Sequence, residues 1–310
     1  MTETMTAMRH GVRALVLVVL SLGVISPAFG QNVQNVGALA PDVAITPDVV
    51  YGHKDGMALT FDVFKPTRPN GAAVLHMVSG GWVSRYSPPT QLPVGIRDLY
   101  QQLLEKGFTV FAVRHGSSPK YVIPEIVPDV RRAVRFIRMT ASRYGIDPNR
   151  MGVTGMSAGG HLSLMLGTAS DAGDPASEDD VLRVSNRVAA VVAYYAPVDL
   201  DPKAGAVVTE RPSKRFPALN FDEAEVPAVS PIRHVSPDDP PTLLLHGDKD
   251  ALVPINQSEQ IHQAFQQHRV PSQFIIIPGA GHGFQGEDAR RATAATVEWF
   301  VKHLSAAKTN

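Results

Sequence analysis

Continuous apolar runs alternate with amphipathic segments along most of this chain, and this alternation limits the folds that it can adopt. Runs with few polar breaks are typical of strands buried on both faces of a parallel sheet. Such runs are Ala72–Val78, Phe108–Val113, Arg150–Gly155, Arg187–Pro197, Thr242–Asp250 and Ser272–Gly279. Because segments with helical periodicity separate them, the order predicts an α/β fold with a mostly parallel central sheet and helices on both faces.

The clearest helix is predicted over Pro128–Gly145. Val130, Ala133, Val134 and Ile137 fall on one face of it at the spacing i, i+3, i+4 and i+7. The arginines of this segment fall mostly elsewhere, and we interpret them as a solvated face rather than an anion site. Further helices are predicted over Asp98–Lys106, from Ser157 to about Gly167, over Ile255–His268 and over Asp288–Leu304.

The folded domain is predicted to span residues 49–305 and to open with an antiparallel pair, Val49–Gly52 and Ala58–Pro66. Two connections are long. Residues 169–186 carry clustered carboxylates without the spacing of an EF-hand, and we interpret them as a solvated loop rather than a calcium site. Residues 198–240 are rich in proline and are interpreted as a small cap-like insertion, since long connections between core strands usually carry function.

The first thirty residues have the pattern of a secretory signal peptide. Arg9 and Arg13 precede the apolar run Ala14–Ile25, and small residues lead to a predicted cut after Gly30. The run is shorter than the roughly 20 residues that span a bilayer, which disfavours the alternative of an uncleaved anchor. We therefore expect a secreted or periplasmic protein with no membrane span after cleavage, and a linker over residues 31–48.

Charge and cysteine content exclude several classes of partner. The chain has 29 basic and 29 acidic residues, so no basic surplus points to nucleic acid. It has no cysteine, which rules out disulfides, a cysteine-linked lipid anchor and any cysteine metal site. Because no P-loop, dinucleotide fingerprint or H-E-x-x-H motif is present, we expect neither a cofactor nor a metal.

Ser157 is the candidate nucleophile. It is the serine of G-x-S-x-G, a pattern that is weak alone but here lies between an apolar strand and a helix. This setting is that of a nucleophile elbow, a tight turn that presents the hydroxyl at the carboxyl edge of the sheet. The amide of Ala158 then points to the same space from the helix N-terminus and is a candidate oxyanion donor.

A serine nucleophile requires a base and an orienting carboxylate. His282 lies in the glycine-rich loop PGAGHGF that follows the last predicted strand, where it can reach over the sheet edge. His161 is too close to Ser157 in sequence to serve, and we interpret it as a packing or hydrogen-bonded support. Asp248 and Asp250 both follow the strand TLLL, and either could accept a hydrogen bond from the imidazole.

With these residues the chain resembles the α/β-hydrolase superfamily, in its esterase/lipase branch that includes hormone-sensitive-lipase-like and bacterial feruloyl or acetyl-xylan esterase-like proteins. The resemblance runs from about Tyr51 to His303 and rests on SGGW, DVRRAVRFIR, GIDPNRMGVTGMSAGGHLS, PPTLLLHGDKDALVP and GAGHGF. It implies the chain order serine, aspartate, histidine. It also implies that the acid is the second aspartate of HGDxD, which is Asp250, and that Asp248 supports the turn.

One element departs from the family pattern. The family usually has HGGGW at the oxyanion loop, whereas the aligned segment here is Val78–Trp82, with the sequence VSGGW. The resemblance implies that Gly80 and Gly81 still offer backbone N–H groups. For Ser79 we weigh a hydroxyl donor against a loop-stabilising role and favour the second.

Together with the predicted signal peptide, the resemblance implies a secreted serine hydrolase that cleaves carboxylic esters, of the carboxylesterase or acetylesterase type, through an acyl-enzyme on Ser157. The substrate would be a small-molecule or polysaccharide-linked ester. Two alternatives stay open: a peptidase of the prolyl-oligopeptidase type, and a catalytically silent binding module on the same fold. Aromatic residues that could line the substrate pocket, weighed against ordinary core or cap packing, are Trp82, Tyr86, Tyr194, Tyr195, Phe216, Phe221 and Phe284.

Overall fold

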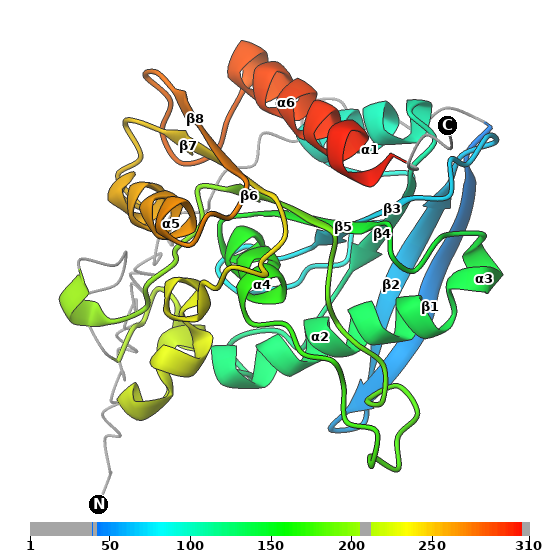
Figure 1. The fold of residues 1–310 in the computed structure, drawn as a ribbon, viewed down its shortest axis with the longest axis horizontal. Helices are drawn as coiled ribbons and strands as arrows, with labels where there is room; N and C mark the ends of the chain where they lie inside the picture. The colour runs from blue at the N-terminus through cyan, green and yellow to red at the C-terminus, as the bar shows by residue number, and fades with distance from the viewer. Residues whose placement is uncertain (1–38, 40–41, 205–211, 306–310) are drawn as a thin grey trace, which may run out of the picture. The chain divides into compact units, whose positions relative to one another are not determined.

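An eight-stranded sheet organises the computed structural model, which describes residues 39, 42–204 and 212–305 (Figure 1). The strand order is β1-β2-β4-β3-β5-β6-β7-β8. The strands are β1 Ala44–Lys54, β2 Met57–Lys65, β3 Ala73–Met77, β4 Thr109–Val113, β5 Met151–Met156, β6 Ala190–Tyr194, β7 Thr242–Gly247 and β8 Ser272–Ile277. The pairs β1–β2 and β2–β4 are antiparallel and all others are parallel, which confirms the expected sheet and its antiparallel opening.

The first strand begins earlier than expected. β1 starts at Ala44, so residues 44–48 of the expected linker form strand and pair with β2. Most side chains of β1 are exposed because the strand lies at the sheet edge, and such a strand has no continuous apolar run to reveal it. The predicted signal peptide and residues 31–38 lie outside the described residues.

Helices cover both faces of the sheet, as expected. α1 and α6 lie on one face, and α2, α4 and α5 lie on the other (Figure 1). Each face has its own apolar cluster, built on alternate side chains of the strands. The helices are α1 Val94–Glu105, α2 Ile123–Met139, α3 Ala141–Tyr144, α4 Ala158–Thr168, α5 Asn256–Gln267 and α6 Gly286–Leu304.

The arginines of α2 are not a solvated face, so that interpretation is wrong. Arg135 is 6% exposed and pairs with Asp171, and Arg132 pairs with Asp179. Arg138 donates to three backbone carbonyls of later loops, among them that of Ser185 at 2.9 Å. The loop 169–186 therefore lies along this side of α2, and two of its carboxylates neutralise arginines.

In the described residues of the long connection after β6, the structure has short 3-10 helices and no α-helix. Within its described part they are Pro202–Ala204, Pro217–Leu219, Glu223–Glu225, Pro227–Val229 and Pro231–His234. Val226 and Val229 are buried and belong to the apolar cluster that α2 and α4 share. This segment therefore packs onto the face of the sheet that carries α4.

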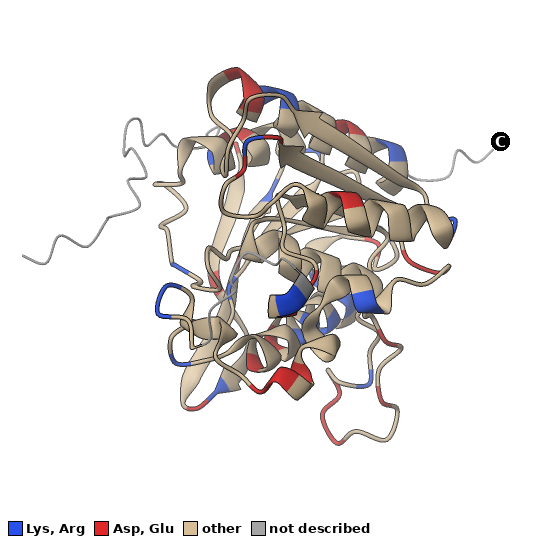
Figure 2. Ribbon diagram, turned by 90° about the vertical axis from the view of Figure 1, so that its left-hand side faces the viewer, with Lys and Arg blue, Asp and Glu red and all other residues tan. Residues whose placement is uncertain are grey.

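Basic and acidic residues are interspersed along the described ribbon, in keeping with a formal net charge of zero (Figure 2). Within the described ranges no helix has the length and apolar character needed to cross a bilayer. The same residues contain no group of three His, Asp or Glu side chains arranged to hold a metal ion.

Candidate active site

Ser157 occupies a strained turn between β5 and α4. Its backbone has φ 55° and ψ −118°, a region that residues other than glycine rarely adopt. Its amide donates to the carbonyl of Tyr194 in β6 at 2.9 Å, and its carbonyl accepts from His161 in α4 at 2.9 Å. The turn is therefore fixed from the neighbouring strand and from the following helix.

Two glycines make this turn possible because other backbone segments approach them closely. A Cβ at Gly155 would lie 2.3 Å from the carbonyl of Gly159, and one at Gly159 would lie 2.4 Å from the carbonyl of Met77. Only glycine lets α4 begin this near β3 and β5. The glycines of G-x-S-x-G are thus required by the close packing of β3, β5 and α4.

The three residues expected to act together lie within hydrogen-bonding distance. Ser157 Oγ is 2.9 Å from His282 Nε2, and His282 Nδ1 is 2.8 Å from Asp250 Oδ2. They come from the turns that follow β5, β8 and β7. Parallel strands place those turns at one edge of the sheet, which is why residues so far apart in the chain meet there.

Asp250 has partners on both carboxylate oxygens. The amides of Leu252 and Val253 each donate to Oδ1 at 2.8 Å, and Oδ2 contacts both His282 and His246. Burial alone would raise the pKa of Asp250, but hydrogen bonds from His246, His282 and the Val253 amide outweigh it and hold the pKa well below its usual value. The group is therefore a carboxylate at neutral pH.

Asp248 supports the neighbouring turn, as the resemblance implies. Its Oδ1 accepts from the amide of Gly279 at 2.6 Å, at the base of the loop that carries His282. The two aspartates of HGDKD therefore have different partners. Asp250 contacts the imidazole of His282, and Asp248 holds the loop on which that imidazole sits.

The oxyanion loop presents fewer free amides than expected. The N–H of Gly80 donates to Val83 at 3.1 Å, so the expectation that both glycines offer a free amide is wrong for Gly80. Among the described residues, the amides of Gly81 and Ala158 have no acceptor. The carbonyl of Ser79 accepts from Gly159 at 3.2 Å, which joins this loop to the first turn of α4.

The Ser79 hydroxyl does not stabilise the loop in the way we favoured. Its Oγ is buried and has no hydrogen-bond partner among the described residues. The loop-stabilising contact of this residue is instead made by its backbone carbonyl.

His161 supports the site, as expected, by joining three segments. Its Nδ1 accepts from Trp82 Nε1 at 3.2 Å, and its Nε2 donates to the carbonyl of Val229 at 2.7 Å. The residue is fully buried, and burial lowers its pKa to about 4, so the ring is neutral at pH 7. It links the oxyanion loop, α4 and the segment after β6.

Of the expected pocket aromatics, Trp82, Phe216 and Phe284 lie near these elements. Phe216 packs edge-on against Trp82 with ring centroids 6.5 Å apart, and Phe284 packs against Tyr195 at 5.0 Å. Tyr86 is 53% exposed and stacks with the Arg114 guanidinium instead, so no contact brings it to Ser157.

Tyr195, one of the aromatic residues expected near the pocket, packs directly on His282, with ring centroids 4.7 Å apart. It has the left-handed backbone value φ 35°. No sequence signal marks this conformation, because Tyr195 simply follows an apolar strand.

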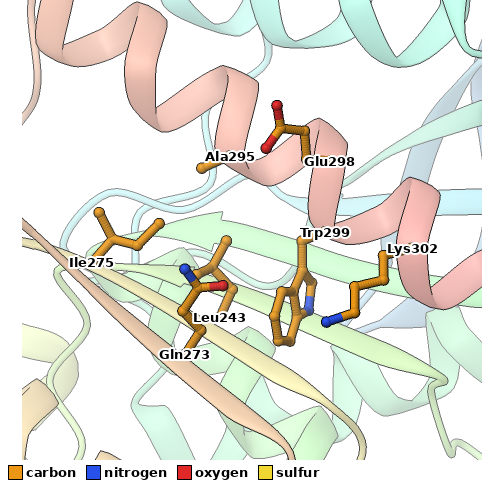
Figure 3. A pocket seen from close by; sticks show the side chains of 7 residues that line it. All are labelled: Leu243, Gln273, Ile275, Ala295, Glu298, Trp299 and Lys302. Atoms are coloured by element: carbon orange, nitrogen blue, oxygen red, sulfur yellow. The ribbon is translucent and has the colours of Figure 1, made fainter.

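A separate cavity lies away from this arrangement, between β7, β8 and α6 (Figure 3). Its volume is about 140 Å³, and residues of α6 form one wall. Its lining residues are Leu243, Gln273, Ile275, Ala295, Glu298, Trp299 and Lys302. None of them contacts Ser157, His282 or Asp250.

The sheet order, the strand–Ser157–helix turn and the helices on both faces define an α/β-hydrolase. Residues 61–265 match the model of the family BD-FAE, and the chain belongs to this family. The family lies in the esterase branch of the α/β-hydrolases, as the sequence resemblance implied.

Two relatives of the chain are named as ester-hydrolysing enzymes. It is 30% identical to the probable carboxylic ester hydrolase LipM of Mycobacterium tuberculosis, over 90% of this chain and 67% of LipM. It is 29% identical to the esterase LipC of the same organism, over 83% of this chain and 64% of LipC. The chain thus spans about two thirds of the length of these curated relatives.

A solved structure is also similar at the level of fold and sequence. The truncated form of a carbohydrate esterase from gut microbiota has a TM-score of 0.69 at 27% identity, and the match covers 85% of this chain and 99% of that one.

Proposed function

We propose that the protein is a serine esterase that hydrolyses carboxylic esters through an acyl-enzyme on Ser157. The observation that carries the proposal is the hydrogen-bonded line from Ser157 Oγ through His282 to Asp250, on a strained turn that holds the hydroxyl in place. Each member of this line has the partner that nucleophilic catalysis by serine requires.

In the first half-reaction, Ser157 Oγ attacks the ester carbonyl and His282 Nε2 takes its proton. Asp250 accepts from Nδ1, which fixes the tautomer that leaves the Nε2 lone pair facing the hydroxyl. The imidazolium that forms is stabilised by the carboxylate. The tetrahedral intermediate then collapses, and His282 returns the proton to the departing alkoxide.

The oxyanion is stabilised by backbone amides on two sides. Ala158 donates from the first residue of α4, and Gly81 donates from the oxyanion loop, because both amides are free of other acceptors among the described residues. Each such donor is worth roughly 3–4 kcal/mol of transition-state stabilisation. The Gly80 amide, already bonded to Val83, has a supporting role in holding the loop.

In the second half-reaction, water replaces the alcohol. His282 deprotonates the water, which attacks the acyl carbonyl, and the same amides stabilise the second oxyanion. Collapse of this intermediate releases the carboxylic acid and restores the Ser157 hydroxyl. The chain supplies the nucleophile, the base, the orienting carboxylate and the oxyanion donors, and solvent supplies the water.

The similarity to a solved carbohydrate esterase bears on the substrate class. That protein has the same fold and 27% sequence identity, which supports esters of sugars or polysaccharides as substrates. Aromatic side chains of Trp82, Phe216 and Phe284 would line the pocket for such esters. Export through the first thirty residues would bring the enzyme to polysaccharides outside the cytoplasm.

A panel of acetate, butyrate, long-acyl and feruloyl esters tests the proposal, with a peptide amide panel beside it. We expect hydrolysis of short acyl esters and no amide cleavage. Ser157→Ala should lower kcat by about 10⁶-fold, because removal of the nucleophile alone abolishes nearly all triad catalysis. Phosphonate labelling that survives Ser157→Ala, or an absence of ester hydrolysis in the unaltered protein, would contradict the assignment.

A further inference from the structure

A second buried histidine contacts the carboxylate that orients His282. His246 lies near the end of β7 and is 0% exposed. Its Nε2 is 2.8 Å from the carbonyl of Val253 and 3.3 Å from Asp250 Oδ2. Both neighbours of Nε2 are acceptors, so Nε2 carries a proton and donates it toward them.

Ser258 fixes the other side of this ring. It lies in the first turn of α5, is 2% exposed, and its Oγ is 2.7 Å from His246 Nδ1. In the tautomer with the N–H at Nε2, Nδ1 is the acceptor and the Ser258 hydroxyl is the donor. The two acceptors at Nε2 thus set the tautomer, and the Ser258 hydroxyl satisfies the other ring nitrogen.

These contacts restrict the Asp250 side chain from two directions. Val253 donates its amide to Asp250 Oδ1 at 2.8 Å and offers its carbonyl to His246. His246 therefore holds the turn that carries Asp250 as well as the carboxylate oxygen that faces His282. If His246 were removed, Oδ2 would keep only His282 among the described side chains, and the Val253 carbonyl would lose its contact with β7.

We propose that His246 is a positioning residue for the catalytic aspartate, and that Ser258 positions His246. Five side chains then form one line of polar contacts from α5 to the elbow, in the order Ser258, His246, Asp250, His282 and Ser157. This inference rests on the proposed esterase function. It adds to that function two residues that set the orientation of Asp250 without touching the substrate.

The test compares three variants, His246→Leu, His246→Gln and Ser258→Ala, in steady-state hydrolysis of an acetate ester. We expect His246→Leu to lower kcat by about 10- to 100-fold with KM unchanged, since it removes a hydrogen bond to a charged group. Gln keeps an N–H donor near the position of Nε2, so His246→Gln should recover most of the lost kcat. Ser258→Ala should lower kcat by a smaller factor, because a neutral hydrogen bond is lost.

His76→Leu is the matched control. His76 is likewise a buried strand histidine, bonded through Nδ1 to the hydroxyl of Tyr100 at 2.8 Å, but it contacts no residue of the proposed triad. Both leucine variants should lower the melting temperature, and only His246→Leu should lower kcat. If His246→Leu does not fold, the kcat of Ser258→Ala and His246→Gln decides the matter.

The two possible failures have different signatures. If the unaltered protein hydrolyses the ester and the His246 and Ser258 variants keep its kcat, the positioning role is overturned while the esterase function stands. If KM rises and kcat does not fall, the two residues act on the substrate pocket and the inference is also wrong. If the unaltered protein hydrolyses no ester, the proposed function fails first.

Discussion

At the scale of single residues, the site depends on side chains that their hydrogen bonds hold in a single orientation. Asp250 has four partners on two oxygens, and His282 has an acceptor at Nδ1 and a hydroxyl at Nε2. A buried carboxylate with every lone pair engaged cannot turn without breaking several bonds. The geometry that catalysis would need is therefore present before any substrate binds.

The Asp250→Asn substitution tests whether Asp250 orients the His282 imidazole. The amide would offer an N–H where His282 Nδ1 now donates, which favours the wrong imidazole tautomer. We expect kcat to fall by about 10⁴-fold with the fold retained. Ester hydrolysis and circular dichroism of the variant measure both effects. A loss of less than about tenfold would show that Asp250 does not orient His282.

At the scale of elements, the elbow is a contact between β5, β3 and α4 rather than an isolated motif. The first turn of α4 lies against Met77 and Ser79, and the strained backbone of Ser157 persists because β6 and α4 hold it from both sides. Strain of this kind costs about 1–3 kcal/mol and needs surrounding structure to maintain it. Packing of these elements therefore sets the position of the nucleophile.

Gly159→Ala tests that packing, with Gly95→Ala as its matched control. Both glycines are the second residue of a helix, but a Cβ at Gly159 would lie 2.4 Å from a carbonyl, whereas nothing lies within 4 Å of one at Gly95. We expect Gly159→Ala to lower the free energy of unfolding by about 3 kcal/mol and to reduce activity. Gly95→Ala should be neutral or stabilising by up to about 1 kcal/mol.

Chemical denaturation of the two variants measures this difference. Equal stability would mean that α4 can shift away from β3 without cost, which would contradict the close approach described here.

At the scale of the whole molecule, buried neutral histidines make the free energy of unfolding depend on pH. Burial lowers the pKa of His76, His115 and His161 to about 4 each, against 6.5 for an exposed histidine. These residues lie in β3, in the turn after β4 and in α4, so several parts of the core share the property. In the unfolded chain all three are free to take a proton near neutral pH.

The sign of the effect follows from proton uptake. Between about pH 6.5 and pH 4 the unfolded chain binds protons at these histidines and the folded protein does not, so stability is lost as the pH falls through this window. At pH 5 the loss is roughly 2 kcal/mol for each histidine.

Urea denaturation at pH 7.5 and pH 5.0 measures the change in unfolding free energy. His76→Gln should show a smaller loss than the unaltered protein, because one of the three groups is removed. Identical stability at both pH values would contradict the neutral state of these histidines.

Local sequence patterns predict the elements of this fold but not the contacts between distant segments. The buried strands and the turns that carry Ser157, Asp250 and His282 were predicted, because each is encoded by neighbouring residues. The arginine face of α2 was misinterpreted, since periodicity shows that a face is polar but not that a distant loop covers it. His246 was overlooked although it stands in the same HGDKD segment as Asp250.

The order of strands and helices, the family and the three residues of the proposed triad can all be predicted from the amino-acid sequence. Apolar runs, helical periodicity and short motifs are local properties that follow from burial and backbone geometry. Three contacts become visible in the folded chain alone. The Gly80 amide donates to the Val83 carbonyl, Tyr195 packs on His282, and His246 contacts Asp250. Those contacts depend on which strand ends and loops meet at one edge of the sheet, and no local pattern carries that information.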